Sequence, residues 1–355
     1  MKKKLYLSLL FLIISFFSLF GLEIEVIKNP KPTCYEKKEM YIPLKVYKMI
    51  RENDGDDENF LGEASQITAD GSGNIYIFDR VFTQIFKYDK DLNFKKRFGD
   101  RGKGPGEFNL HRRSVGAFLK IAGDKLYANG YRNRKISVFS LAGDFIKEYK
   151  IYNKYPFVPE VDAEGNFYIP SLNGGVIDIY NSKMERIEVL LDDKEFQQFL
   201  FEMPRFPYKV FLCYPERKNL YYSLLKNNRL LIYIQNSSTI HLLENRKLKN
   251  KYHIWPDKVL KLYRQKVEEL PDEEGVFVYY AVHFFMDEDD KNFFYIQFGR
   301  DKIANIVPLY KFDLKGNLEK IFYIKGSEGE ATFFKCKKNN IFYAVIDEKV
   351  VLYKN

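Results

Sequence analysis

The sequence predicts an all-β protein that folds as a six-bladed β-propeller with four-stranded antiparallel blades. Three observations lead to this prediction. The composition is rich in strand-forming aromatic residues, with 27 Tyr and 32 Phe but a single Trp. A unit of short strands separated by turns recurs along the chain, and its last copy lacks one strand that a segment near the N-terminus can supply.

The repeating unit is clearest between residues 64 and 98. Its strands alternate with turns and polar loops, and they are predicted at 64–69, 75–78, 84–88 and 93–98. The turn Gly71-Ser72-Gly73-Asn74 has the Gly and Asn residues that tolerate positive φ in hairpins. We interpret the Asp residues of these turns as turn formers rather than as calcium ligands.

The same order recurs in five further copies. Their strands are predicted at 125–128, 136–140 and 145–151; 167–170, 176–180 and 186–190; 230–234, 239–243 and 251–254; 293–298, 307–312 and 318–324; and 341–346 and 349–353. The last copy lacks its outermost strand, which we expect the segment Met40–Ile50 to provide. Pairing the two ends of the chain in one blade closes the ring and removes an open edge.

Two insertions interrupt the period, and both are predicted to contain a helix. The first spans about 192–214, and the second, about 256–271, begins at Pro256 and carries apolar residues at helical spacing. The predicted organisation is a signal peptide at 1–21, an N-terminal extension at 22–39 and the propeller at 40–355.

The N-terminus has the order of a secretory signal: Lys2-Lys3-Lys4, an apolar run from Leu5 to Phe20, and Gly21. At about 1.5 Å per residue, this run is shorter than a bilayer core of about 30 Å, although tilting would allow an uncleaved anchor. Cleavage leaves 54 basic against 48 acidic residues, a net charge of +6 instead of +9. We therefore expect an exported protein, periplasmic or extracellular, with no stable membrane span after cleavage.

The stretch Gly-Asn-Ile-Tyr-Ile-Phe-Asp at 73–79 and the sequence Gly-Lys-Gly-Pro-Gly-Glu-Phe at 102–108 resemble an NHL-type repeat, as found in exported six-bladed β-propeller proteins of bacteria. In that resemblance Asp79 begins an upper loop and 102–108 is the crossing between blades. The similarity covers about residues 60–180, and later units lack the Gly-Pro-Gly crossing. It implies a binding or scaffold module, but the same fold hosts calcium-dependent lactonases and a zinc-dependent amidating lyase.

Several chemistries are disfavoured by the residues present. Three Cys and four His argue against a disulfide scaffold or a multi-zinc module. Lys103 is followed by Gly104 and Pro105, so the glycine-rich stretch is not a P-loop. His111 and His283 fall near predicted inner strands, too few for a zinc set unless carboxylates complete it. We expect no cofactor and keep calcium as an alternative that no motif indicates.

Cys34, Cys213 and Cys336 form either one disulfide and one free thiol or three buried thiols.

The candidate site is a basic loop face, because the crossings and the loops after each second strand emerge at one end of a propeller. Its residues are Arg80, Arg112, Arg113, Tyr131, Arg132, Arg134, Asn173 and Arg300. Arginine suits bidentate contacts with carboxylates or phosphates. The alternative is a solvated rim, neutralised by acidic residues of the same loops such as Asp79, Asp301 and Glu348.

We therefore predict a non-enzymatic ligand- or protein-binding module whose partner is an acidic peptide, glycan or protein surface. Nucleic acid is not an expected partner for an exported chain. The alternative is a metal-dependent propeller enzyme of the lactonase or lyase type with its site at the central channel. A subunit of a larger envelope assembly is a third hypothesis.

Overall fold

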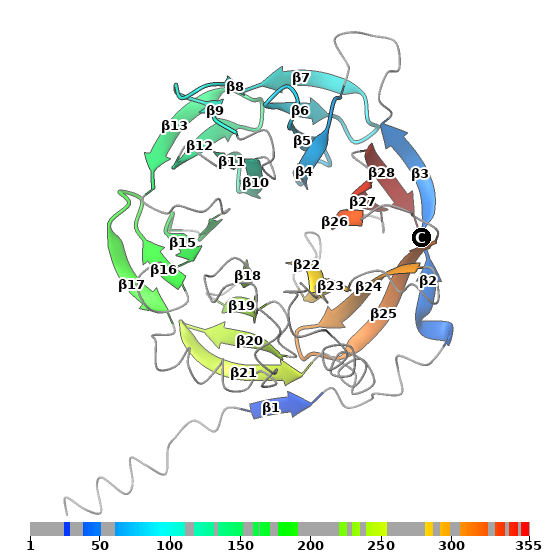
Figure 1. Ribbon diagram of the computed structural model, residues 1–355. Coiled ribbons are helices and arrows are strands. Elements are labelled where there is room, and N and C mark those ends of the chain that lie inside the picture. Colours follow the sequence, from blue (N-terminus) through cyan, green and yellow to red (C-terminus); the bar gives the residue numbers. More distant parts are fainter. Residues whose placement is uncertain are drawn as a thin grey trace, which may run out of the picture.

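Six blades form a closed ring around a central axis in the computed structural model of the chain (Figure 1). The structure describes residues 25–28, 38–50, 61–110, 117–130, 134–151, 159–162, 164–170, 177–190, 220–225, 229–234, 239–253, 281–286, 292–298, 306–325, 331–337, 341–346 and 349–354. Each blade runs from an inner strand next to the axis to an outer strand at the rim, and in blades four to six the rim strand comes from the N-terminal segment. The predicted fold class is confirmed.

The first three blades have four antiparallel strands each, in sequence order from the axis outward. They are β4 (Ala64–Ala69), β5 (Ile75–Asp79), β6 (Gln84–Tyr88) and β7 (Phe94–Phe98); β10 (Ala117–Ala122), β11 (Lys125–Gly130), β12 (Lys135–Ser140) and β13 (Phe145–Lys150); and β14 (Glu160–Val161), β15 (Phe167–Pro170), β16 (Ile177–Tyr180) and β17 (Arg186–Leu190). A short parallel pair, β8 (Asp100–Arg101) and β9 (Glu107–Phe108), lies in the crossing between the first and second blades.

The other three blades include strands from the N-terminal segment. They are β18 (Leu220–Leu225), β19 (Arg229–Ile234), β20 (Thr239–Glu244) and β21 (Lys247–His253) with β1 (Glu25–Lys28); β22 (Ala281–Met286), β23 (Phe293–Phe298), β24 (Ile306–Asp313) and β25 (Leu318–Lys325) with β2 (Tyr41–Pro43); and β26 (Ala331–Lys337), β27 (Ile341–Ile346) and β28 (Lys349–Lys354) with β3 (Lys45–Ile50). Strands β1 and β2 add in parallel to the outer edges of blades four and five.

Helix is almost absent from the described residues, whose only helical element is the three-residue 3-10 turn η2 (Lys38–Met40). The predicted helical insertions at 192–214 and 256–271 lie outside the residues that the structure describes, as does the predicted signal peptide. Within the described part of the chain no helix is long and apolar enough to cross a bilayer.

The N-terminal strand closes the last blade, but with fewer residues than predicted. Strand β3 pairs antiparallel with β28, whereas Tyr41–Pro43 belongs to blade five. The expectation that all of Met40–Ile50 completes the last blade is therefore wrong. Leu44 joins the two parts: its N–H donates to the Tyr323 carbonyl at 2.8 Å, and its side chain belongs to the buried cluster formed by blades five and six.

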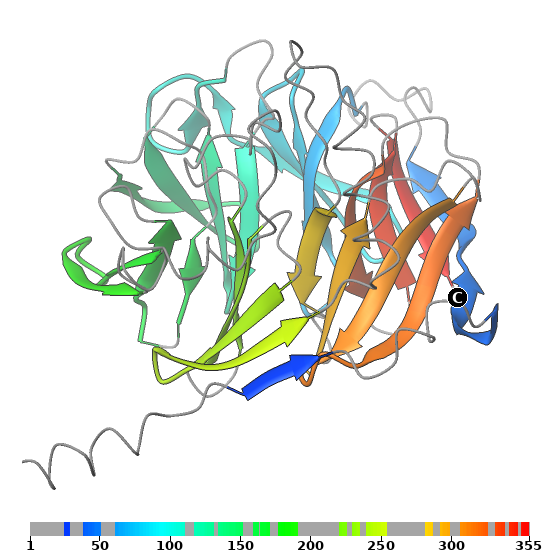
Figure 2. The ribbon, with the colours of Figure 1, turned by 60° about the horizontal axis from the view of Figure 1, so that its bottom comes forward.

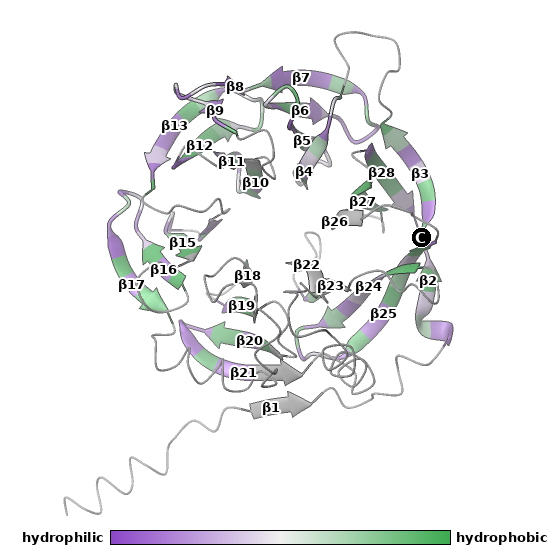
Figure 3. Ribbon diagram, in the orientation of Figure 1, coloured by the Kyte–Doolittle hydropathy of each residue, from purple (hydrophilic) through white to green (hydrophobic). Residues whose placement is uncertain are grey.

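Both faces of a blade's middle strands are buried against neighbouring blades. In β5, Ile75 and Ile77 pack against blade six, while Tyr76 and Phe78 pack against blade two. Because successive side chains point to opposite faces of a sheet, a strand buried on both faces reads as a continuous apolar run. Outer strands such as β7 are more hydrophilic than β28 (Figure 3).

The outer strand of the fourth blade begins earlier than predicted, at Lys247 instead of at residue 251. Asn245 and Arg246, with φ of 49° and 66°, form a two-residue turn of the kind that glycine usually supplies. An ion pair between Arg246 and Glu188 of blade three accompanies this conformation. The turn contains no Gly, so the sequence did not reveal it.

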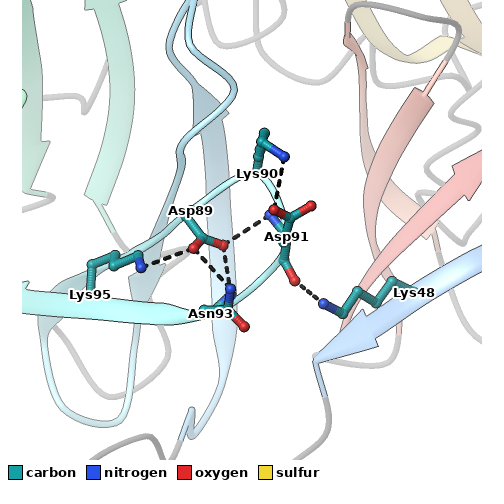
Figure 4. Close-up of polar contacts among 6 residues, drawn as sticks. All are labelled: Lys48, Asp89, Lys90, Asp91, Asn93 and Lys95. Carbon is teal, nitrogen blue, oxygen red and sulfur yellow. Dashed lines mark hydrogen bonds and ion pairs between the residues drawn. The ribbon is translucent and has the colours of Figure 1, made fainter.

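Polar contacts link the outer strand of one blade to the outer turn of the next. Lys96 pairs with Asp144 at 3.1 Å. At the boundary between blades six and one, which we call the closing seam, Lys48 on β3 donates to the Asp91 carbonyl (Figure 4). Exposed ion pairs contribute only about 0–1 kcal/mol, so these contacts orient the blades more than they stabilise them.

The turn at the closing seam is held by Asp89. Its carboxylate accepts hydrogen bonds from the Asp91 and Asn93 N–H groups, both at 2.9 Å, and lies 2.9 Å from Lys95 Nζ (Figure 4). Burial alone would raise the pKa of Asp89, but the hydrogen bonds from Asn93, Lys95 and Asp91 hold it below its usual range. Asp89 therefore acts as a turn former.

The closing role of β3 predicts that a chain starting at residue 51, which lacks β2 and β3, is much less stable than one starting at residue 38, which keeps both strands. Removing the buried side chains of Leu44 and Ile50 alone costs about 3–6 kcal/mol, and the β28 edge becomes exposed. The measurements are the melting temperature and size-exclusion profile of both chains. Equal melting temperatures would show that the ring does not depend on this strand.

Candidate functional site

The structure describes two of the eight predicted ligand-binding residues, Arg80 and Arg134. The other six lie outside the described residues, and their participation stays a prediction: Arg112, Arg113, Tyr131, Arg132, Asn173 and Arg300. Arg80 follows the second strand of blade one, and Arg134 precedes the third strand of blade two. Since the strands of all blades run between the two ends of the ring (Figure 2), this topology places both arginines at the same end.

The crossing at 99–108 connects the loops that carry these two arginines. On one side, Arg101 donates through Nε to Thr83 Oγ1 at 3.3 Å and through Nη2 to the Val81 carbonyl at 3.4 Å. On the other side, Lys135 Nζ donates to the Lys103 carbonyl at 3.3 Å. Arg80 and Arg134 therefore flank one structural element.

Core packing determines the shape of the crossing. The Phe108 ring is buried edge-on against Phe78, with centroids 5.3 Å apart. Gly99 has φ of +75°, and a Cβ there would lie 2.5 Å from the Phe108 ring. The Gly102 N–H donates to the Phe108 carbonyl at 3.0 Å. The crossing is thus a tight passage that only glycine permits at Gly99.

The inside of the crossing is occupied by the protein's own carboxylate. Glu107 Oε2 accepts a hydrogen bond from the Gly104 N–H at 2.7 Å. A Cβ on Gly102 would lie 1.9 Å from the same oxygen, so the glycine makes room for it. This arrangement agrees with our interpretation of the glycine-rich stretch as a passage between blades rather than as a phosphate cradle.

Asp79 holds the neighbouring loop, residues 80–83, in place through hydrogen bonds. It is fully buried, and its two oxygens accept hydrogen bonds from the N–H groups of Gly62 at 2.6 Å, Val81 at 2.8 Å and Phe82 at 2.9 Å. Burial raises the pKa of Asp79, and these hydrogen bonds partly oppose that rise. The carboxylate joins the chain entering blade one to the loop that carries Arg80.

Charges on this end of the ring fall into two groups. Arg80 forms an ion pair with Glu63, and the buried Lys135 lies 2.7 Å from Glu148, so fixed carboxylates offset both cations. The second group is exposed and consists of Arg101, Lys103 and Arg134. No carboxylate pairs with any of these three among the residues that the structure describes.

Sequence reasoning did not single out Arg101 and Lys103. Both lie in the glycine-rich crossing, which we interpreted from its glycines as a passage between blades. The signal that could have indicated these two residues is the presence of basic residues among the glycines. The pairing of Arg80 with Glu63 was equally hidden, because these residues are 17 positions apart and meet only when the blade forms.

Near the axis, Lys120 of β10 and Glu160 of β14 form an ion pair of 2.6 Å that joins blades two and three. His283 lies in β22 and Cys336 in β26, both inner strands, while His111, Cys34 and Cys213 lie outside the described residues. In the described ranges no three His, Cys, Asp or Glu residues come together as a metal site would require.

The chain belongs to the DUF5128 family of 6-bladed beta-propellers, which matches residues 54–313. A comparison with curated proteins finds no match. This membership agrees with the ring of six blades and assigns no chemistry to it.

Several solved structures are similar to this chain at low sequence identity. A Bacteroides fragilis protein whose name describes it as exported is 12% identical, with a TM-score of 0.54 over 93% of this chain and 98% of its own. A duf4221 family member from Bacteroides vulgatus is 10% identical, with a TM-score of 0.55 over 88% and 97%. A catalytically inactive virginiamycin B lyase from Staphylococcus aureus with quinupristin is 12% identical, with a TM-score of 0.49 over 88% and 99%. The first two similarities support the fold alone.

The Asp79 contacts predict that Asp79→Asn destabilises the protein, because the new amide donates where the Gly62 N–H needs an acceptor. The expected loss is about 1–3 kcal/mol in the free energy of unfolding, measured by urea denaturation. Asp124→Asn, at an exposed hairpin end, is the control that should change nothing.

The loss should also depend on pH. The raised pKa means that the folded state holds this proton more tightly than the unfolded chain, so the wild type loses stability as the pH rises above 3.8 through that pKa. Asn does not ionise, so the wild-type advantage should shrink as the pH rises above 3.8 through the raised pKa of Asp79. An advantage that grows with pH would contradict this assignment.

Proposed function

We propose that this protein is a non-enzymatic binding module that acts outside the cytoplasm and takes an acidic ligand on its loop face. The observation that carries the proposal is the set of exposed cations at the first crossing, Arg101, Lys103 and Arg134. Arg101 and Lys103 stand on a backbone that is held by buried Phe108 and by the Glu107 carboxylate, and Arg134 lies in the neighbouring loop before β12.

Rigidity and charge distribution both support ligand binding. A site that is ordered before it binds loses little conformational entropy on binding. Glu107 and Glu148 are held by internal partners, while the three cations are exposed, so the surface offered to a ligand favours anions. The ligand is an acidic peptide, glycan or protein surface, and Arg112, Arg113, Arg132 and Arg300 would extend the site.

Export is part of the proposal. It is supported by the signal-like residues 1–21 and by the fold shared with a Bacteroides fragilis protein that is named as exported. The NHL-type character of the repeat is proposed on the motifs at 73–79 and 102–108. An exported location also makes nucleic acid an unsuitable partner, despite the basic residues.

Metal analysis of the purified protein distinguishes the binding module from the rival hypothesis, which is a metal-dependent enzyme with its site at the central channel. We expect no stoichiometric, tightly held calcium or zinc. A stoichiometric ion that survives dialysis would replace the binding-module proposal by the enzyme hypothesis.

Reversing charges on the loop face should abolish acidic-ligand binding. The double variant Arg113→Glu with Arg132→Glu is compared with wild type by calorimetric titration with poly-L-glutamate and with polygalacturonate. Losing two charge-assisted contacts of about 1.5–3 kcal/mol each should weaken binding at least a hundredfold.

The matched control is Lys183→Glu with Lys315→Glu, which makes the same charge change in exposed turns at the opposite end of the blades. It should leave the affinity nearly unchanged. An equal loss in both variants would mean that net charge alone governs binding, and unchanged affinity in the first would show that Arg113 and Arg132 belong to a solvated rim outside the binding site.

A further inference from the structure

We propose that the acidic ligand is a peptide in which a carboxylate neighbours an apolar side chain, and that it binds at a surface formed by Val81, Arg101, Arg80 and Glu63. This inference rests on the proposed function, because it takes acidic-ligand binding on the loop face as given. It chooses the peptide over the acidic glycan.

The apolar part of this surface is Val81, which is 47% exposed at the tip of a short loop between β5 and β6. Its N–H donates to Asp79 at 2.8 Å, and its carbonyl accepts from Arg101. The backbone is therefore held on both sides, and the side chain is the part of the residue left for a partner. A Cβ on Gly62 would lie 2.8 Å from the Val81 Cβ, so the glycine below makes room for this position.

The cationic part is the Arg101 guanidinium, whose orientation the protein fixes in advance. Nε and Nη2 both donate to Thr83 Oγ1 at 3.3 Å, and Nη2 also reaches the Val81 carbonyl. Among the described residues Nη1 has no hydrogen-bond partner, which leaves it for a carboxylate oxygen of a ligand. Because Arg101 contacts the backbone of Val81, a cation and an apolar side chain are presented side by side.

Carboxylates on the same surface disfavour a dense polyanion. Glu63 is 32% exposed beside Arg80, and Asp100 is exposed next to Arg101. Like charges repel, so a polygalacturonate chain with a charge on every unit meets both of them. A peptide that places one carboxylate at Arg101 and an apolar side chain on Val81 avoids this repulsion and gains apolar contact.

The test uses the full mature chain and three 12-residue peptides built on Gly and Ser. One contains three Leu-Glu pairs, the second replaces Leu by Ser, and the third replaces Glu by Gln. In calorimetric titration the Leu-Glu peptide should bind about fivefold or more tightly than either of the others. Poly-L-glutamate and polygalacturonate are titrated in parallel.

Two variants assign the effect to this surface. Val81→Ser should weaken the Leu-Glu peptide about three- to tenfold and leave the Ser-Glu peptide unchanged, whereas Arg101→Gln should weaken both about tenfold. The controls are Ile187→Ser, which removes a similarly exposed apolar side chain from the rim of blade three, and Lys183→Gln.

The outcomes separate the two proposals. If no acidic probe binds the wild type, the proposed function fails. If poly-L-glutamate or polygalacturonate binds at least as tightly as the Leu-Glu peptide, or if Val81→Ser has no effect, the peptide inference is overturned while the proposed function stands. Equal binding of the Leu-Gln peptide would overturn the role of Arg101.

Discussion

Each blade of this protein buries both faces of its middle strands against its two neighbours, so the ring has to close for any blade to be complete. Tyr76 and Phe78 face the second blade, and Ile75 and Ile77 face the sixth. Burial of such side chains contributes about 1.5–3 kcal/mol each, far more than the exposed ion pairs between the blades. Closure by β3 is therefore the step on which the other packing depends.

The N-terminal segment does more than close the ring. It adds β1 to blade four and β2 to blade five before β3 completes blade six, and buried Leu44 marks the change from one blade to the next. An added strand covers a sheet edge that would otherwise pair with other chains. The outer strand of blade one is protected differently, by the exposed charges of Lys95, Lys96 and Arg97.

The same aromatic packing that joins blades one and two positions the candidate site. Phe108 lies between Phe78 and Phe139, with ring centroids 5.3 and 6.1 Å away, and it holds the crossing against the core. Arg101 and Lys103 are exposed because the backbone on which they stand is anchored in this way. The loop face is thus a consequence of inter-blade packing, with the charges distributed over a rigid support.

The repeat, the number of blades and most strand bounds could be predicted from the amino-acid sequence, because alternation of side chains and the Gly and Asn turns are local properties. The strands that the N-terminal segment joins, the start of β21 in the fourth blade, and the partners of the cations became visible only in the folded chain. Arg80 meets Glu63, and Lys135 meets Glu148, through strand pairing that brings distant residues together. Such pairings depend on strand register and on contact between blades, which no local sequence pattern encodes. For that reason Arg101 could be identified as an exposed candidate binding residue only from the fold.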